Sequence, residues 1–389
     1  MKRAFLLVLI AIAVHGAAVS NSVDSLLVLL DQSIARAETY SHERESRIEG
    51  LKSLLAQSAQ EPDQQYLVYS KLAAEYRPYI FDSALHYLYV KTELAQKMNR
   101  TDWVAESNVQ TLGLLSATGM YKEAFDVLGG IDRAEVRTQV LPDFYANMAN
   151  LYSQMAFYTR VGSMVPEYYG LVSQYRDSVL QVVQAQDRLA REIREFVFYN
   201  RNELDQSLQM AHDLLSETPL NDPKYALYAY RVACNYRDLG NIDKEKEYLI
   251  RSAIADIQNG IKDNASLTML AMILYREKEI ARAYDYIQFS LADAAFFKAP
   301  LRYIELSNVL PVINDAYHIR LEKQKRTLEH YLLLISFLAV FLISSLVFIV
   351  MQFRNLANVR TDLQVANQKL NQLNAELSGA NEQLNGLNN

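Results

Sequence analysis

The stretch GLLSATGMYKEAFDVL (residues 113–128) predicts a pair of packed helices, and two other segments repeat its pattern. AAEYRPYIFDSALHYL (residues 73–88) and AMILYREKEIARAYDYI (residues 271–287) each contain an apolar helix, a short polar break and a second helix. The second helix opens with a small residue, and an apolar residue follows four positions later. Because a small side chain lets two helices approach closely, we expect the two helices of each copy to pack against each other.

The small and apolar positions recur along the chain and are predicted to pack the repeat. The clearest copies pair Ala84 with Leu88, Ala124 with Leu128, and Ala283 with Ile287. Two weaker copies place Ser207 before Ala211 and Glu245 before Leu249. Successive copies are about 40 residues apart, except for one interval of about twice that length. We therefore expect a degenerate copy between Pro142 and Val182.

These positions also carry a resemblance to a known repeat. Gly119 before Ala124, and Pro219 after Ser207, match positions of the tetratricopeptide repeat, and the chain resembles that family although no copy has all of its signature residues. The resemblance implies a curved solenoid, because one helix pair cannot bury its own apolar face. It also implies a concave groove that binds a peptide or protein segment. We interpret each of the 26 tyrosines singly as a core residue, and the concave face as a whole as the binding surface.

A membrane span follows the repeats. YLLLISFLAVFLISSLVFIVMQF (residues 331–353) contains no charged residue. At a helical rise of about 1.5 Å per residue it matches a hydrocarbon core roughly 30 Å thick. The stretch therefore predicts one transmembrane helix, with the parts before and after it on opposite sides of a bilayer.

The N-terminus indicates the orientation. Lys2 and Arg3 precede an apolar run (residues 4–14) and small residues (15–20), which is typical of a signal peptide, cleaved or retained as a signal anchor. The basic residues around the span weakly favour the opposite orientation, but long domains translocate largely regardless of such charges. We expect a bacterial inner-membrane protein with a periplasmic N-terminal domain and a cytoplasmic C-terminal tail.

The tail has the pattern of a coiled coil. Apolar residues follow one another at alternating intervals of three and four, which favours a coiled-coil seam over a lone amphipathic helix. The seam residues are Leu356, Val359, Leu363, Leu370, Leu373, Leu377, Leu384 and Leu387, with Ala366 and Ala380 at the two weaker positions. Gly379 and Gly386 lower the helix propensity. A parallel homodimer is the expected partner, because two copies leave the bilayer in the same direction.

Composition and motifs exclude several classes of function. A net charge of -6 without a basic patch argues against direct nucleic-acid binding. Cys234 is the only cysteine, so no intramolecular disulfide can form, and we interpret it as a small buried side chain rather than a reactive thiol. The histidines lack metal-ligand spacing, and no phosphate-binding loop or nucleophile elbow occurs. We therefore expect no enzyme activity, no cofactor and no metal.

A second resemblance covers most of the chain. The segments at residues 248–275, 281–297 and 306–317 are similar to membrane proteins of Bacteroidota that are described as transcriptional regulators. The tail at residues 366–384 and the upstream segments at residues 47–55 and 81–87 also fit. The resemblance implies a signalling role. Members typically continue past the coiled coil into a cytoplasmic domain, so we expect an output module that this sequence does not include.

The sequence thus predicts an all-α chain: a helix-turn-helix repeat solenoid, one transmembrane helix and a coiled coil. The predicted parts are a signal peptide (1–20), the repeat domain (21–300), a membrane-proximal helix (301–330), the span (331–353) and the cytoplasmic coil (354–389). Our hypothesis is a solenoid that binds a protein or peptide and relays its state to a dimeric coil. The alternatives are a static scaffold that recruits envelope proteins, and the sensor half of a histidine kinase whose catalytic part is absent here.

Overall fold

The computed structural model describes residues 23–58, 60–262, 265–298 and 300–387, and these are helical apart from short turns. No strand occurs in those ranges, which confirms the predicted all-helical fold. The predicted signal peptide lies outside the described residues. The chain divides into two compact units between Tyr317 and His318, and each is described here by itself.

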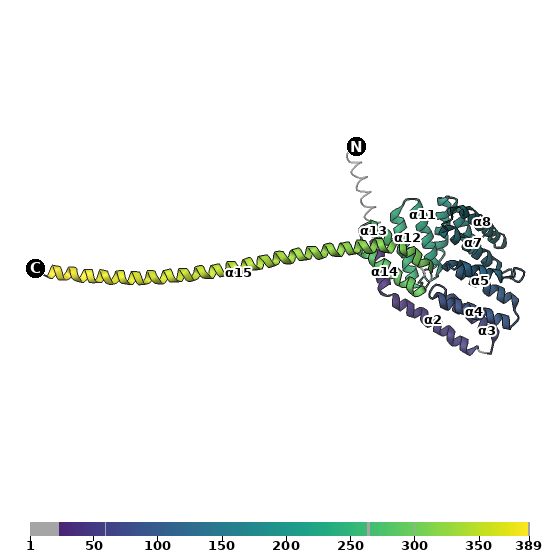
Figure 1. Cartoon of the computed structure of the whole chain (residues 1–389), viewed down its shortest axis with the longest axis horizontal. Helices are drawn as coiled ribbons and strands as arrows, with labels where there is room; N and C mark the ends of the chain where they lie inside the picture. Colours follow the sequence, from purple (N-terminus) through teal and green to yellow (C-terminus); the bar gives the residue numbers. More distant parts are fainter. Residues whose placement is uncertain (1–22, 59, 263–264, 299, 388–389) are drawn as a thin grey trace, which may run out of the picture. The chain divides into compact units, whose positions relative to one another are not determined.

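Most of the first unit consists of antiparallel helix pairs (Figure 1). They are α3 (Pro62–Tyr76) with α4 (Phe81–Lys97), α5 (Thr101–Thr118) with α6 (Tyr121–Gly129), α7 (Leu141–Tyr158) with α8 (Val165–Val182), α9 (Arg188–Asn200) with α10 (Leu204–Ser216), α11 (Lys224–Asp238) with α12 (Ile242–Gln258), and α13 (Ser266–Arg276) with α14 (Ile280–Phe297). The α7–α8 pair, which a short 3₁₀ turn (Gly162–Met164) connects, occupies the interval where a degenerate copy was expected.

The residues at the small positions lie on the second helix of their pairs and are buried. Ala84, Ala124 and Ala283 are at most 1% exposed. Ser207 is also fully buried, and its hydroxyl donates to Glu195 Oε1 (3.0 Å) on the first helix of the same pair. Glu245 is nearly buried, and burial raises the pKa of its carboxyl.

The apolar residues four positions later differ more in exposure. Leu88 and Ile287 are buried, as are Ala211 and Leu249 in the two weaker copies. Leu128 is only half-buried, at the end of the short helix α6. A side chain near a helix end has fewer neighbours than one in the middle. Leu128 is therefore covered only in part.

Tyrosines join the two helices of the degenerate pair. Tyr152 of α7 stacks on Tyr175 of α8, with ring centroids 5.9 Å apart and an interplanar angle of 10°. Tyr145, about two turns earlier on α7, contacts the same ring of Tyr175, with ring centroids 6.4 Å apart. Offset aromatic pairs of this kind hold two helices together over a large contact area. This packing agrees with the interpretation of single tyrosines as core residues.

The N-terminal helices pack against the last repeats rather than only against the first. Val23, Leu27 and Leu30, in the helical residues 23–35, share a core cluster with residues of α12, α13 and α14. Asp31 accepts a hydrogen bond from Tyr286 Oη (2.6 Å) and pairs with Arg282 Nη2 (3.2 Å). The N-terminal helix and the last repeats therefore share one core.

A buried arginine on α2 (Ala37–Gln57) joins the first and the fifth pair. Arg44 Nη2 and Nε donate to the carbonyl of Asn259 (2.7 and 3.2 Å), which follows α12. Its Nη1 donates to the carbonyl of Glu75 (2.6 Å) and to Glu75 Oε2 (3.1 Å), at the end of α3. Gly260, at a φ of +62°, leaves the space that the guanidinium needs, because a Cβ there would lie 3.3 Å from Arg44 Nε. We call this set of contacts the Arg44 joint.

The last helix, α15 (Pro300–Leu387), begins inside the first unit and continues into the second. We call its first part, residues 301–317, the root. Leu301, Leu306 and Ile313 of the root are at most 5% exposed. Pro311 lies within the helix, where its ring removes one backbone hydrogen bond without ending the helix.

The Arg44 joint yields a stability prediction. Arg44→Ala is expected to lower the free energy of unfolding by about 3–5 kcal/mol, because it leaves buried acceptors without a donor. Thermal unfolding of the detergent-solubilised chain, followed by circular dichroism, measures the change. The matched control is Arg47→Ala, which removes a half-exposed guanidinium from the same Glu75 carboxylate (3.4 Å) and should cost at most about 1 kcal/mol. Equal losses in the two variants would argue against the joint.

Candidate binding groove

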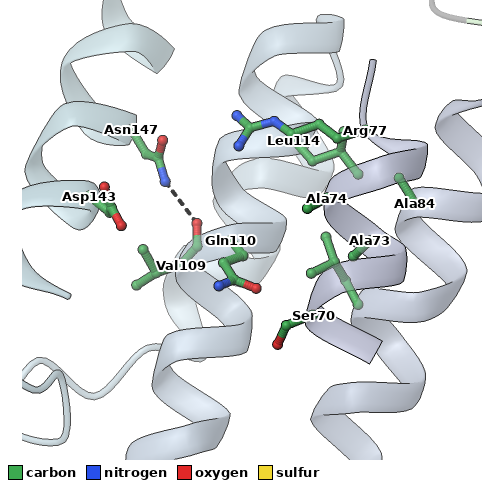
Figure 2. A pocket seen from close by; sticks show the side chains of 11 residues that line it. Ser70, Ala73, Ala74, Arg77, Ala84, Val109, Gln110, Leu114, Asp143 and Asn147 are labelled. Carbon is green, nitrogen blue, oxygen red and sulfur yellow. Dashed lines mark hydrogen bonds between the residues drawn. The ribbon is translucent and has the colours of Figure 1, made fainter. Parts of the chain in front are cut away.

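The first helices of three consecutive pairs, α3, α5 and α7, line a pocket of about 270 Å³ (Figure 2). Its apolar lining comes from small or branched side chains, and its polar lining comes from all three helices. The lining residues are Ser70, Ala73, Ala74 and Arg77 of α3 and its C-terminus, Ala84 and Leu88 of α4, Val109, Gln110 and Leu114 of α5, and Asp143 and Asn147 of α7. We call this cavity the groove pocket.

Helices α5 and α7 approach each other closely at the pocket. Asn147 Nδ2 donates to the carbonyl of Val109 (2.9 Å), as Figure 2 shows. Gly113, one turn further along α5, makes room for this amide, because a Cβ there would lie 2.6 Å from Asn147 Oδ1. The glycine and the asparagine together lock the register of the two helices.

The pocket carries charges of both signs. Asp143 is open to solvent inside the groove, and desolvation by the surrounding helices raises the pKa of its carboxyl. The positive charges of Arg77 and Lys224 oppose this shift, so both lie near the carboxylate. A molecule that fills the pocket would meet a carboxylate on one wall and a guanidinium on another.

A fully buried lysine lies behind the pocket. Lys91 of α4 donates to Gln110 Oε1 (2.8 Å), lies 3.6 Å from Glu106 Oε1 and sits 4.3 Å from the ring centroid of Tyr66. Arg137 pairs with the other oxygen of Glu106. Burial, and then the nearby charge of Arg137, lowers the pKa of Lys91 to about 7. Because Gln110 also lines the pocket, the protonation of Lys91 affects a side chain that a bound molecule would contact.

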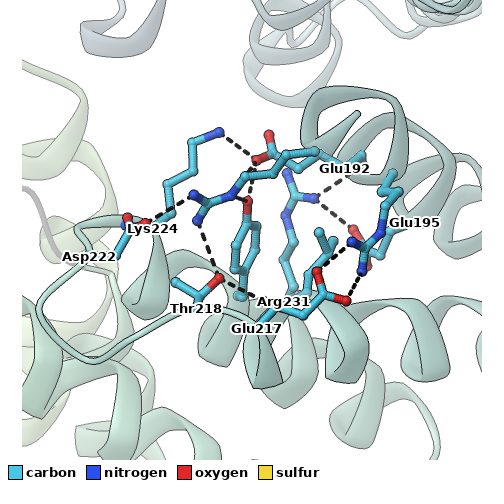
Figure 3. Close-up of polar contacts among 11 residues, drawn as sticks. Glu192, Glu195, Glu217, Thr218, Asp222, Lys224 and Arg231 are labelled. Atoms are coloured by element: carbon cyan, nitrogen blue, oxygen red, sulfur yellow. Dashed lines mark hydrogen bonds and ion pairs between the residues drawn. The ribbon is translucent and has the colours of Figure 1, made fainter. Parts of the chain in front are cut away.

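A second polar cluster lies between α9, α10 and α11 (Figure 3). Glu195 accepts from Arg231 Nη1 (2.9 Å), and Glu192 accepts from Lys224 Nζ (2.5 Å) and from the hydroxyl of Tyr228. Both carboxylates are nearly buried. Burial and the bond to Glu192 raise the pKa of Tyr228, so its phenol stays protonated and remains a donor. Every charge here has an opposite partner, which is typical of a structural network rather than a reactive site.

Other candidate reactive groups also lack the environment that chemistry requires. Cys234 is half-buried rather than buried, and desolvation raises the pKa of its thiol to about 11. It was predicted to be a buried side chain; it lies instead on a face of α11 that solvent partly reaches. Within the described ranges, no group of three or more His, Cys, Asp or Glu side chains is arranged to hold a metal ion.

The pocket shares two residues with the predicted repeat packing. Ala84 and Leu88 were predicted as packing residues, and they also form the floor of the pocket. Ala124, Leu128, Ser207, Glu245, Ala283 and Ile287 do not line it. The polar residues Arg77, Gln110, Asp143 and Asn147 were missed. One or two polar residues in a helix do not make a periodic signal.

The predicted span and the predicted seam both lie on α15, in the second unit. The apolar residues 331–353 belong to a helix that is long and apolar enough to cross a membrane, and none of this stretch is buried within the protein. The seam residues with described side chains are Leu356, Val359, Leu363, Leu370, Leu373 and Leu377, and all are exposed. Leu384 and Leu387 lie on the helix, but their side chains are outside the described residues.

The pKa of Lys91 predicts a pH dependence of stability. An unfolded lysine titrates near pH 10.4, whereas burial holds the folded one at about 7. Between these values the unfolded state binds more protons, so the free energy of unfolding rises with pH, by up to about 1.4 kcal/mol per unit. Denaturant titrations from pH 7 to 9.5 measure this slope, which should be smaller in the matched variant Lys91→Met. If the unmodified chain and Lys91→Met show the same slope, Glu106 keeps Lys91 charged in the folded state and the prediction is wrong.

Comparisons with known proteins identify one matching family. The model of the family described as "SusR N-terminal TPR domain" matches residues 34–308. No curated protein matches the chain. Among solved structures, the crystal structure of BtubC (BKLC) from P. vanneervenii is similar over 64% of this chain and 95% of that chain, with 13% sequence identity and a TM-score of 0.22.

The family match covers more than half of the 389 residues, from the helical residues 23–35 to the root of α15. It confirms the predicted resemblance to tetratricopeptide-repeat proteins of Bacteroidota, and it agrees with the helix pairs that the structure contains. The chain therefore belongs to the family of the SusR N-terminal TPR domain.

Proposed function

We infer that the chain is a membrane-anchored signalling protein whose repeat domain binds a protein or peptide segment in the groove pocket. The pocket is the observation that carries this proposal. It combines an apolar floor with Arg77, Gln110 and Asp143 on neighbouring parts of the groove. A few placed polar groups on an apolar surface are typical of sites that fix the orientation of a bound molecule. Repeat solenoids commonly use such concave faces to bind protein segments.

The membrane part of the proposal rests on residues 331–353. Their apolar side chains have no protein cover, and a helix of this length satisfies its own backbone in hydrocarbon. With a signal peptide at residues 1–20, the repeat domain would be periplasmic and residues 354–389 cytoplasmic, in the inner membrane of a bacterium. These assignments follow from the sequence pattern.

The output part of the proposal rests on the exposed seam. Leucines repeat along one stripe of α15, and those whose side chains are described are exposed. A second copy would present the same stripe in the same direction, so a parallel homodimer would bury both. We propose that occupation of the groove changes the packing of this coil and that the coil passes the change to an output module.

Groove binding can be tested by site-specific photo-cross-linking. p-Benzoylphenylalanine in place of Ala74 or Gln110, which line the pocket, is expected to form an adduct with a second protein on irradiation of intact cells. Immunoblotting of the tagged chain detects the adduct. The control position is Glu123, exposed on α6 and outside the pocket. An equal yield at Glu123, or no adduct at either pocket position, would contradict binding in the groove.

The dimer can be tested by cysteine cross-linking in membranes on a Cys234→Ala background. Leu363→Cys and Leu370→Cys lie on the predicted seam and should form disulfide-linked dimers on mild oxidation. Gln364→Cys and Gln368→Cys lie off the seam and should not, because a parallel coil keeps these positions apart. Gel electrophoresis without reductant measures the yield.

The cross-linking pattern also separates the two classes of function. A signalling protein requires the seam yield to change when the groove is occupied, whereas a static scaffold requires a constant yield. Equal or absent cross-linking at all four positions would contradict the dimer and leave a membrane-tethered binding module.

A further inference from the structure

We propose that helices α5 and α7 couple the groove pocket to the root of α15, so that a molecule in the pocket changes how firmly the root is held. This inference rests on the proposed function, because it assigns a regulatory role to the same pocket. Two helices carry the argument. Each lines the pocket along its length and contacts the root at its C-terminal end.

At the pocket, the two helices are joined to each other. Asn147 of α7 donates to the carbonyl of Val109 on α5 (2.9 Å), and its amide fits closely against Gly113, where a Cβ would lie 2.6 Å from Asn147 Oδ1. Asn147 and Val109 both line the pocket. A side chain or peptide group that enters the pocket therefore competes with, or presses on, the contact that sets the spacing of α5 and α7.

At its far end, α7 contacts the root through a charged hydrogen bond. Tyr158, the last residue of α7, donates its hydroxyl to Glu305 Oε1 (2.7 Å). Arg302 Nη1 donates to the other carboxylate oxygen of Glu305 (2.6 Å) and so fixes its orientation. Burial and the bond to Glu305 raise the pKa of Tyr158, so the phenol remains a donor at physiological pH. Hydrogen bonds to a charged acceptor are among the stronger ones in proteins.

The far end of α5 contacts the root through packing. Gly119 ends the helix at a φ of +84°, and a Cβ there would lie 3.5 Å from Leu301 Cβ. Leu301 is buried. From Gln110 to Gly119 the helix rises about 13 Å, and from Asn147 to Tyr158 about 17 Å. Both distances are short enough for a helix to move as a rigid rod.

The root is the part of α15 that connects the first unit to the rest of the helix. Leu306 and Ile313 pack in the core cluster that also contains Val23 and Leu27. Beyond the root, α15 remains helical through the apolar residues 331–353. A shift of α5 or α7 would therefore loosen or tighten a helix that leads to the span. Packed cores of this kind switch between discrete arrangements rather than deform continuously.

The test fills the pocket chemically and measures the root. Ala74→Cys, on a Cys234→Ala background, is modified with benzyl methanethiosulfonate in the purified full chain, and hydrogen exchange is followed by mass spectrometry. Ala74 lines the pocket and is exposed to the reagent. We expect residues 300–317 to exchange at least roughly fivefold faster after modification, the lower end of typical coupling between sites.

Two controls isolate the coupling. The same reagent at Glu123→Cys, outside the pocket, should leave exchange of residues 300–317 unchanged. Tyr158→Phe removes the hydrogen bond from α7 to Glu305 and leaves the contact of α5 with Leu301, so in this variant modification at Ala74→Cys should change exchange at the root less. The matched variant Tyr152→Phe makes the same change on α7 at a residue that packs against Tyr175, and it should retain the response.

The result that overturns the proposal is unchanged exchange at residues 300–317 after modification, whether or not α5 and α7 respond. A response that survives Tyr158→Phe undiminished would overturn the role of Tyr158. The probe here is a covalent benzyl group, so the result does not depend on any natural partner. Failure of the photo-cross-linking at Ala74 and Gln110 would reject the proposed binding function and leave this measurement unaffected.

Discussion

One guanidinium joins the first and the fifth helix pair of the repeat array. Arg44 gives three of its N–H groups to the carbonyls of Glu75 and Asn259, which belong to the first and fifth helix pairs. Carbonyls at helix ends are otherwise without partners, and a buried arginine is stable only when its donors are used. The array is therefore closed on itself through α2, whereas in an open solenoid each repeat contacts only its neighbours. The groove pocket and the root of α15 both belong to the unit that this arginine closes.

The interior of the first unit is rich in polar contacts, and each has a structural consequence. Ser207, Glu195 and Arg231 connect helices of neighbouring pairs, and Lys91 connects α4 with α5 through Gln110. Such networks specify one register, because a shift by one turn would leave buried charges without partners. Precise register matters for a protein in which the same helices line a pocket and contact the helix that leads to the membrane.

The sequence predicted the helix pairs, because those depend on local periodicity. Ala84, Ala124 and Ala283 could be found by aligning the chain with itself. Arg44 could not, because one of its acceptors is a backbone carbonyl 215 residues away and carries no side-chain signal. The pocket residues Arg77 and Asp143 were missed for a related reason. Their proximity depends on the curvature of the stack, which is the sum of many small rotations between helices.

Because of the shared core, the N-terminal helix cannot complete its packing when it is first synthesised. Val23, Leu27 and Leu30 are synthesised first, yet their partners on α13, α14 and α15 come roughly 250 residues later. The pairs from α3 to α10 rely on local contacts and can form early, as helix-rich segments do. The apolar face of residues 23–35 therefore stays uncovered until the last pair has formed. Folding of this domain is therefore complete only when residues 23–35 pack. Until then this segment depends on protection from proteases and aggregation.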